Sequence, residues 1–477
     1  MRSAPLFYYG LCFLLGISSH ILFHPAYFVI LALLIFLWKN RLATGILTAA
    51  IGFAFAAIAV TLPSLPEEGV QVKGTFIPES ISYGHSPFGT SYVMKGSFSS
   101  AAYSRVPCQI YTPANKPRPP GNQHLRIEGK LLPKTFPIYV LKLAHYEPIP
   151  KTYSLAEWRF KIKDWARLQF KSMFSSQDTA SFLLSMVTGE IDDRLMALQF
   201  NRLGLLHLLG VSGFQFSLLA LLLGALLRMF LSPAKGTLLL IVLLTAYAFI
   251  LGNSPPIQRA WVGTALYAIA RLAGFQISPM NALGAALLWE LLLDPCVFFQ
   301  LGFQFSFLCT AAIFIVYPTI REFFMRWLPA RTFGEARSLP LLDRVGYVFT
   351  FFCRETIALN IAIHLVSLPL IFFHFHKFPL LSLAYNLFLP ALVSLAYLFL
   401  IPGILLHPIA HFLSYPFLKI AGLLTDGMLL VATSPPTLFD FQWRVPNFTL
   451  GWALLTLTLL ILIFYERGRL LDRVFRR

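Results

Sequence analysis

One stretch in the second half of the chain combines glycines with polar side chains inside a leucine-rich run. The polar residues are His207, Ser212 and Gln215, and the glycines are Gly204, Gly210 and Gly213. Polar side chains at membrane depth are scarce and usually functional. Broken backbone is tolerated there only where it lines a wet cavity or is buried in protein. We therefore predict a discontinuous helix that turns polar groups toward a translocation path; close helix packing through small residues is the alternative.

The five residues Gly-Phe-Gln-Phe-Ser occur twice, at 213–217 and at 302–306. Either the repeat is a coincidence in a chain with 46 Phe, or two equivalent helices present Gln and Ser to a shared interior. On the second interpretation Gln304 and Ser306 join the predicted path, and Gln304 lies near Gln215 across it.

Arg259 follows Pro-Pro in the first turn of a predicted helix. A cation is mildly disfavoured there, because a helix N-terminus already carries partial positive charge. Some acidic group should therefore compensate it, and the sequence leaves three choices open: a nucleic-acid phosphate, a lipid phosphate or Glu290. We include Arg259 in the predicted path.

A helix predicted at 154–173 begins with Ser154 and Glu157, which fit a capping box. Its basic residues recur at every fourth position and so form one stripe, with two tryptophans on the neighbouring face. The basic residues are Arg159, Lys163, Arg167 and Lys171, and the tryptophans are Trp158 and Trp165. Such a helix either lies on anionic lipid or guides nucleic acid, with cations on phosphates and Trp rings on bases.

Motif patterns argue against most enzyme classes. No Gly-x-x-x-x-Gly-Lys-Ser/Thr, Gly-x-Ser-x-Gly or His-Glu-x-x-His sequence occurs, so no nucleotide-hydrolysing, serine-hydrolase or zinc-protease site is predicted. The five cysteines lack metal-ligand spacing. We expect no catalytic residue, no metal site and no cofactor. A membrane-embedded enzyme is the weaker alternative, and its acid and base groups would be Glu190, Asp192, Asp193 and His207.

The elements that position these residues are mostly membrane helices. The chain has 477 residues, of which 57% are hydrophobic and 12% charged, a composition that excludes an ordinary soluble protein. Its apolar runs, which begin with 5–22, 26–38 and 43–62, predict a polytopic α-helical membrane protein of about 12 spans, some broken or re-entrant. Residues 318–355 are predicted to form a polar, basic loop.

Residues 64–150 differ from the rest, because short alternating runs are separated there by Gly, Pro and Asn. They predict one small β-barrel or sandwich. The predicted domains are 1–63, N-terminal transmembrane helices; 64–150, β domain; 151–178, basic amphipathic helix and linker; 179–465, transmembrane channel domain; and 466–477, basic tail.

The net charge is +17, and its distribution orients the chain. If the N-terminus is cytoplasmic, seventeen Lys and Arg residues fall in inner segments and three in short outer loops. This positive-inside pattern predicts that both termini lie in the cytoplasm and that the β domain is extracytoplasmic.

Several of these segments, taken together, resemble the ComEC-type competence channel family. They are His207-Leu-Leu-Gly-Val-Ser-Gly213, Arg259-Ala, Asp294-Pro295, Gly302-Phe-Gln-x-Ser-Phe307 and a stretch from Leu368 to Pro390 that includes Asn386. The resemblance runs in order over roughly 180–395, and it adds Asn386 to the predicted path. Where the family usually has an aliphatic residue and His after Val-Ser-Gly, this chain has Phe214 and Gln215.

The resemblance implies an inner-membrane channel that passes single-stranded DNA into the cytoplasm during natural transformation, with an OB-like outer β domain. It also implies a separate DNA receptor and a cytoplasmic motor. Many family members carry a C-terminal metallo-β-lactamase-like domain; the sequence ends at Arg477 without one, so a separate nuclease is expected. The alternative to a DNA channel is a transporter of another anionic solute, such as a lipid-linked or phosphorylated metabolite. An external β domain with a basic helix favours DNA.

Overall fold

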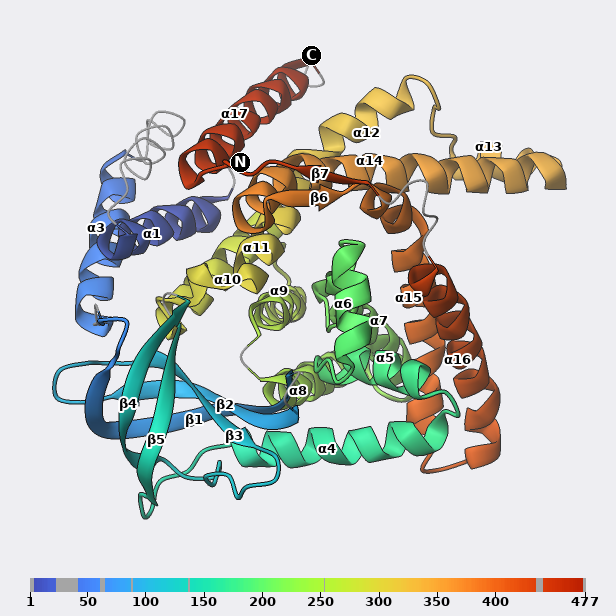
Figure 1. The fold of residues 1–477 in the computed structure, drawn as a ribbon. Helices are drawn as coiled ribbons and strands as arrows, with labels where there is room; N and C mark the ends of the chain where they lie inside the picture. Colours follow the sequence, from blue (N-terminus) through green and yellow to red (C-terminus); the bar gives the residue numbers. More distant parts are fainter. Residues whose placement is uncertain are drawn as a thin grey trace.

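The structure is a computed structural model that describes residues 4–22, 42–60, 65–86, 89–135, 138–252, 254–434 and 441–474. Within them, five β-strands form one body and helices make up most of the rest (Figure 1). The predicted span at 26–38 lies outside the described residues.

The β domain is a closed five-stranded barrel. Its strands are β1 (Val70–Ser86), β2 (Gly89–Ser99), β3 (Val106–Pro113), β4 (Leu125–Thr135) and β5 (Ile138–Pro148). The order around the barrel is β1-β2-β3-β5-β4, and pairing between β1 and β4 closes it. All pairs are antiparallel except β3 with β5, which is parallel. Alternate residues of β3, namely Val106, Cys108 and Ile110, are buried, as a strand with one inward face requires.

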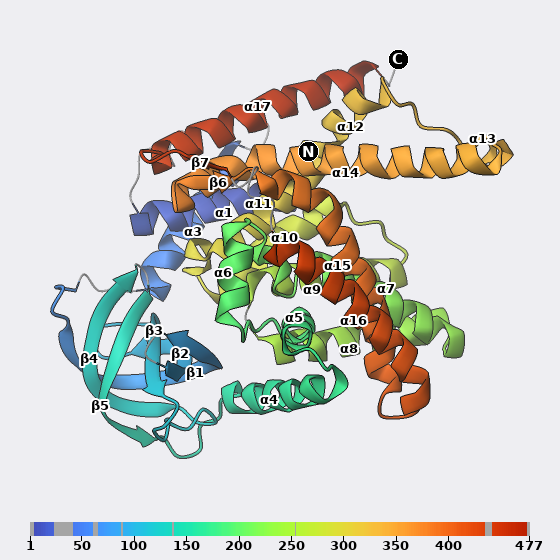
Figure 2. The ribbon, with the colours of Figure 1, turned by 45° about the vertical axis from the view of Figure 1, so that its right-hand side comes forward.

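Helix α4 (Ala156–Met173) leads away from the barrel. Its first turn belongs to the barrel core, because Ala156 and Phe160 pack in the same cluster as Phe76 and Phe98. In both views α4 then extends as an arm beneath the helices that follow (Figures 1 and 2).

The capping box predicted at the start of α4 does not form. Ser154 Oγ donates to the carbonyl of Pro78 at 2.6 Å, and the Glu157 carboxylate accepts hydrogen bonds from Arg118 at 2.7 and 2.8 Å. The two side chains that would have capped the helix bind the barrel domain instead. Contacts distant in the sequence therefore replace the local cap.

Five segments of the described chain are long and apolar enough to cross a membrane. They are Leu206–Phe230, which contains α7 (Gly213–Phe230), α8 (Pro233–Leu251), α14 (Leu341–Phe375), α15 (Leu381–Leu406) and α16 (His411–Thr433). The bent pair α11 (Leu301–Ile315) and α12 (Tyr317–Met325) would make a sixth. The structure thus gives a mostly helical protein with membrane-capable helices, and the predicted count of about twelve spans is not confirmed.

The remaining helices are shorter or less apolar. They are α1 (Pro5–Leu22), α3 (Leu42–Ala59), α5 (Gln177–Thr188), α6 (Arg194–Arg202), α9 (Pro255–Leu272), α10 (Pro279–Leu293), α13 (Phe333–Ser338) and α17 (Leu450–Val474). Core residues of α5, α6, α7, α15 and α16 form one cluster, and those of α1, α9, α10 and α11 form another. In both views α14 and α17 lie across these helices from the barrel (Figures 1 and 2).

The segment predicted as a basic loop, 318–355, is largely helical. It contains most of α12, α13 and the first part of α14. Arg354 is fully buried there, donating to Glu355 Oε1 at 2.6 Å and to the Leu328 carbonyl at 2.7 Å. Because Arg354 donates all these hydrogen bonds to protein groups, it does not need water. The helix can therefore continue through a segment that was predicted to be a solvated loop on account of its charge.

Candidate functional site

The glycine-rich stretch lies between two helices of the structure. α6 ends at Arg202, Gly204 takes a left-handed conformation with φ of 71°, and a short 3-10 turn, η2 (Leu206–Leu208), precedes α7. A left-handed residue terminates a helix, and glycine adopts that conformation without steric cost. The backbone is therefore non-helical between Leu209 and Ser212.

Ser212 and Gln215 form the N-terminal cap of α7. Ser212 Oγ accepts a hydrogen bond from the Gln215 backbone N–H at 3.2 Å, and Gln215 Oε1 accepts one from the Ser212 N–H at 2.7 Å. This reciprocal capping box satisfies two backbone donors that have no partner inside the helix. The two side chains thus fix where α7 begins.

Both copies of Gly-Phe-Gln-Phe-Ser stand at helix starts, and Arg259 lies between them. α7 begins with Gly213 and α11 begins one residue before Gly302. Arg259 Nε donates to Ser306 Oγ, in the second copy, at 2.7 Å. A Cβ at Gly213, in the first copy, would lie 2.3 Å from Arg259 Nη2. Glycine at 213 is therefore what lets the guanidinium approach the first turn of α7.

Three helix N-termini meet around Arg259. Arg259 is in the second turn of α9, not in the first turn as the sequence predicted, because the helix already begins at Pro255. A Cβ at Gly302 of α11 would contact Pro256 of α9 at 3.4 Å. Each helix N-terminus carries roughly half a positive charge, so three of them and one guanidinium make a strongly positive place. We call Arg259, Gly213, Pro256 and Ser306 the Arg259 site. Its charge distribution suits an anion such as phosphate, which helix N-termini bind readily.

Acidic compensation for Arg259 is weak. Glu290 of α10 acts on Arg259 electrostatically, yet among the described residues no carboxylate forms an ion pair with it, whereas nine ion pairs occur elsewhere, for example at Arg167 and Arg321. Arg259 therefore keeps its charge available for another anion.

A second cluster of polar side chains lies around His207. The side chain of His207 is exposed. It lies against Asn386 of α15, whose Nδ2 donates to Ser382 Oγ at 3.0 Å. His364 of α14 lies within electrostatic range of His207.

His364 and Asn360 are polar residues of this group that sequence reasoning missed. His364 Nδ1 lies 2.9 Å from the carbonyl of Asn360, and Asn360 Nδ2 donates to the Leu383 carbonyl at 3.0 Å. Asn360 Oδ1 is buried with no hydrogen-bond partner among the described residues. The signal was present, because an Asn and a His one turn apart interrupt the apolar run of α14.

Among the described residues, Gln304 and Gln215 form no hydrogen bond with each other. Gln304 Oε1 lies 2.7 Å from His374 Nε2, in the last turn of α14, and Gln304 Nε2 donates to the Phe298 carbonyl at 2.8 Å. Gln215 instead caps its own helix and is buried. The repeated motif therefore places its glutamines in two different settings, and the expectation that they face each other gains no support.

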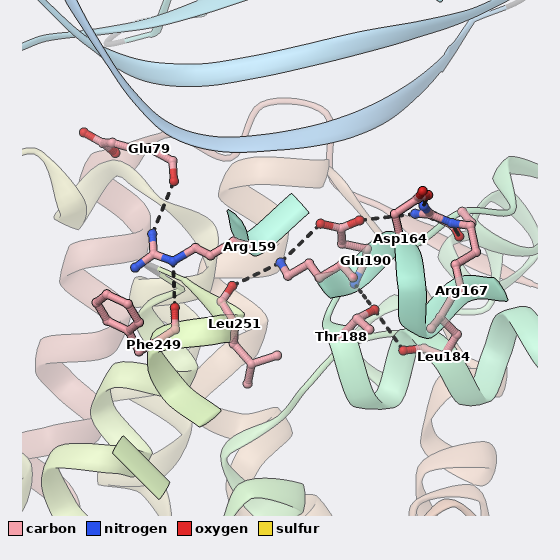
Figure 3. A network of polar contacts seen from close by, with 11 residues as sticks. Glu79, Arg159, Asp164, Arg167, Leu184, Thr188, Glu190, Phe249 and Leu251 are labelled. Atoms are coloured by element: carbon pink, nitrogen blue, oxygen red, sulfur yellow. Dashed lines mark hydrogen bonds and ion pairs between the residues drawn. The ribbon is translucent and has the colours of Figure 1, made fainter. Parts of the chain in front are cut away.

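Three of the four cations of the α4 stripe bind other parts of the chain, and Figure 3 labels two of them, Arg159 and Arg167. Arg159 Nε donates to the Phe249 carbonyl at 2.7 Å, and its Nη1 donates to the Glu79 carbonyl at 3.3 Å. Lys163 Nζ donates to the Leu251 carbonyl at 3.2 Å. Phe249 and Leu251 lie in the last turn of α8, where carbonyls lack helical partners and carry partial negative charge. The two cations therefore cap α8 from outside.

Arg167 binds three carboxylates (Figure 3). It donates to Asp164 Oδ1 at 2.7 Å, to Asp192 Oδ1 at 2.8 Å and to Glu190 Oε2 at 3.4 Å. Burial alone would lower the pKa of Arg167, but the hydrogen bonds with Asp192 and Asp164 and the nearby Glu190 raise it above its ordinary value. Lys163 adds an ion pair to Glu190 at 3.2 Å. We call Arg159, Lys163 and Arg167 the α4 clamp.

The α4 clamp differs from the predicted contact with DNA or anionic lipid, because backbone carbonyls and carboxylates of the same chain occupy these three cations. Lys171, farther along α4, is exposed. Trp158 and Trp165 remain 49% and 63% exposed, so the tryptophan face, not the basic one, is available to a ligand or to lipid.

The three acids of the alternative enzyme hypothesis all have partners within the chain, and two of them bind the α4 clamp. Glu190 and Asp192 pair with Lys163 and Arg167, while Asp193 accepts hydrogen bonds from the first N–H groups of α6. A cavity of about 620 Å³ beside them is lined by both signs of charge, with Arg167, Lys171 and Arg194 against Asp164, Asp192 and Asp193. This balance does not select an anion, in contrast to the Arg259 site.

The outer surface of the barrel carries one aromatic ring beside a cation. Tyr111 of β3 is 43% exposed, and Lys134 Nζ lies 5.0 Å from the centre of its ring. Lys134 also donates to Gln109 Oε1 at 3.1 Å. Sequence reasoning missed the contact between Tyr111 and Lys134. Strand alternation predicts only that Gln109 and Tyr111 lie on the same face of β3, and Lys134 comes from a different strand.

Comparison with known proteins gives two matches. Residues 184–470 match a family model described as Competence protein. ComE operon protein 3 of Bacillus subtilis (strain 168) is 21% identical over 224 residues, which are 46% of this chain and 25% of that protein. The matched region thus spans about a quarter of this relative's length. No solved structure matches the chain.

Proposed function

The chain belongs to the competence protein family, and from this premise we propose that it conducts single-stranded DNA across the cytoplasmic membrane. The family assignment supports a role in competence and DNA uptake. The channel activity is our proposal, and the observation that carries it is the Arg259 site, where three helix N-termini surround a guanidinium that has no ion-pair partner among the described residues.

The Arg259 site suits a phosphodiester chain for an electrostatic reason. DNA binding draws most of its free energy from phosphate contacts that release counterions. A helix N-terminus stabilises an adjacent anion by about 0.3–1 kcal/mol when exposed and up to ~2 kcal/mol when partly buried. Passage requires weak, repeatable contacts, and one cation with three helix ends supplies such a contact for each successive phosphate.

The proposed path continues through the polar group around His207. Its side chains, His207, Asn386, Ser382 and His364, are polar hydrogen-bonding groups at the chain break and on α14 and α15. Groups of this kind can exchange hydrogen bonds with water and with bases without trapping them. Ser212, Gln215 and Gln304 hold the helix ends that frame the path.

The barrel is proposed to be OB-like and to collect the strand on the extracytoplasmic side of the membrane. Five strands closed into a barrel, with β3 and β5 parallel, support this assignment. Tyr111 beside Lys134, and the exposed rings of Trp158 and Trp165, supply aromatic faces on which unpaired bases stack.

The remaining features of the proposal come from charge distribution and motif content. Both termini are proposed to be cytoplasmic, in an inner-membrane protein of about 12 spans. The chain is proposed to act without catalysis of its own. A DNA receptor, a cytoplasmic motor and a nuclease would then be separate proteins.

Uptake of labelled DNA into a strain deleted for the gene tests the proposal. The wild-type chain should restore label in the cytoplasm, while label bound at the surface stays constant. Arg259→Ala should lower cytoplasmic label by about tenfold, as expected when a charge-assisted contact of ~1.5 kcal/mol is lost, and Arg259→Lys should recover part of it. Arg271→Ala is the matched control, because Arg271 lies at the other end of α9 and is exposed.

Two glycine variants sharpen the test. A Cβ at Gly213 would displace the Arg259 guanidinium, whereas a Cβ at Gly210 meets nothing within 4 Å. Gly213→Ala should therefore behave like Arg259→Ala, and Gly210→Ala should leave uptake unchanged. Normal DNA uptake by the deletion strain would reject the proposal and favour transport of a small anionic solute, which the same positive site would accept.

A further inference from the structure

Glu290 is a buried acid without a partner. It lies in α10, it is 2% exposed, and neither carboxylate oxygen has a hydrogen-bond partner among the described residues. The helices around it are apolar: α1 contributes Phe13 and Ile17 to the core cluster that also holds Leu287 and Leu291 of α10. Buried polar groups are nearly always hydrogen-bonded, so a carboxyl group with two bare oxygens requires an explanation.

Charge and burial together indicate which form the carboxyl group takes. An ionised carboxylate without hydrogen bonds is strongly disfavoured in apolar surroundings. The charged group that acts on Glu290 within the described chain is Arg259 of α9, and the two are not joined by an ion pair. Arg259 donates to Ser306 instead, and Cys309 of α11 also lies near Arg259. In this arrangement Glu290 carries a proton.

We propose that Glu290 is a proton-binding site coupled to the Arg259 site, so that a proton on Glu290 and an anion on Arg259 favour each other. While Glu290 holds its proton, Arg259 is free to bind a phosphate. When the proton leaves to water, the new carboxylate attracts Arg259 and competes with the phosphate. Linkage makes the effect reciprocal: an anion at Arg259 favours the protonated acid.

This inference rests on the proposed function only in taking the anion to be a DNA phosphate. The coupling itself depends on the positions of Glu290, Arg259 and Ser306. It would make anion release at the Arg259 site depend on proton release from Glu290, which is one way for a chain without a nucleotide site to respond to a proton gradient.

Labelling with dicyclohexylcarbodiimide tests the inference on the purified full-length protein in lipid nanodiscs. This reagent adds to protonated carboxyl groups in apolar surroundings, and peptide mass spectrometry locates the adduct. Glu290 should be labelled at neutral pH. Glu355 is the internal control and should stay unlabelled, because Arg321 and Arg354 bind its carboxylate at 2.9 and 2.6 Å.

Inorganic polyphosphate tests the coupling. At a mildly alkaline pH where labelling of Glu290 is partial, polyphosphate should increase it by about fivefold, the lower end of typical coupling between two sites. Arg259→Gln should keep the labelling but abolish the polyphosphate effect, and Glu290→Gln should remove the adduct. An unlabelled Glu290 in folded protein would overturn the proton site. Labelling that ignores polyphosphate would overturn the coupling.

The outcome is separable from that of the proposed function. Labelling requires no transport, so a chain that fails to take up DNA but shows the polyphosphate effect keeps the coupled site and loses DNA as its ligand. A chain that transports DNA with an unlabelled Glu290 keeps the channel and loses the proton site.

Discussion

Replacing Arg167 by alanine should open the junction between α4 and the α5–α6 region. The guanidinium binds Asp164, Glu190 and Asp192, and its side chain is 11% exposed. Removing one partner of a buried ion pair costs about 3–5 kcal/mol, because the remaining charges are left uncompensated. Asp164 is 40% exposed, so water will solvate part of the orphaned charge, and we expect a loss of about 2–3 kcal/mol in the free energy of unfolding.

The assay is thermal unfolding of the full chain in nanodiscs, followed by tryptophan fluorescence. Trp158 and Trp165 lie on α4 itself, so their emission reports on the junction. A loss of that size should lower the melting temperature of a chain of this length by about 2–3 °C. Lys73→Ala is the matched control, because the ion pair of Lys73 with Glu128 is 70% and 47% exposed, and such surface pairs contribute at most about 1 kcal/mol.

A double variant separates charge from packing. Asp192→Ala added to Arg167→Ala removes one orphaned carboxylate, so it should return part of the lost stability, with a coupling free energy of about 1 kcal/mol or more. An Arg167→Ala transition no lower than that of Lys73→Ala, or strictly additive effects of the two substitutions, would refute the clamp as a source of stability.

Three further predictions concern the barrel and the orientation of the chain. Tyr111→Ala should weaken binding of single-stranded DNA by the full chain about tenfold, since stacking of a base on a ring contributes about 1–3 kcal/mol, and fluorescence anisotropy measures it. The hydrogen bond from Arg118 lowers the pKa of Glu157 below its ordinary 4.5. This pair therefore stabilises the barrel above pH 4.5, and its contribution is lost as the pH falls through the lowered pKa. Glu157→Gln should flatten the pH dependence of the melting temperature. A cysteine at Ala101, exposed after β2, should react with a membrane-impermeant thiol reagent in intact spheroplasts, and one at Ser338 should react only after lysis; the opposite result would invert the topology.

The sequence predicted the local features of the fold well. Strand alternation located the β domain and apolar runs located most of the helices, because both signals depend on neighbouring residues. The closure of the barrel through β1 and β4, in contrast, joins segments distant in the sequence. The helical continuation of α14 through basic residues also depends on tertiary partners, as the burial of Arg354 shows.

The sequence predicted the positions of the cations along their helices but not the groups that they bind. Spacing alone placed Arg159, Lys163 and Arg167 on one face of α4, which is correct for the helix, but it could not reveal that α8 ends opposite that face. Helix-dipole reasoning did indicate that Arg259 needs an acidic partner. Helix-dipole reasoning could not show that α7 and α11 begin near Arg259, because the residues that meet at this site, 213, 259 and 306, are distant in the sequence.

The surroundings of Arg167 and Arg259 differ in how much of each arginine's positive charge is compensated by acids. Around Arg167 three carboxylates face one guanidinium and one lysine, so acids already outnumber cations there and an incoming phosphate would have to displace an acid. Around Arg259 a serine hydroxyl and three helix N-termini face the guanidinium, and the nearest acid acts on it without an ion pair. We therefore expect an anion to bind more favourably at Arg259 than at Arg167. Basic residues close in the sequence can hold a fold together, while a single arginine that lacks an acidic partner retains the charge that a polyanion needs.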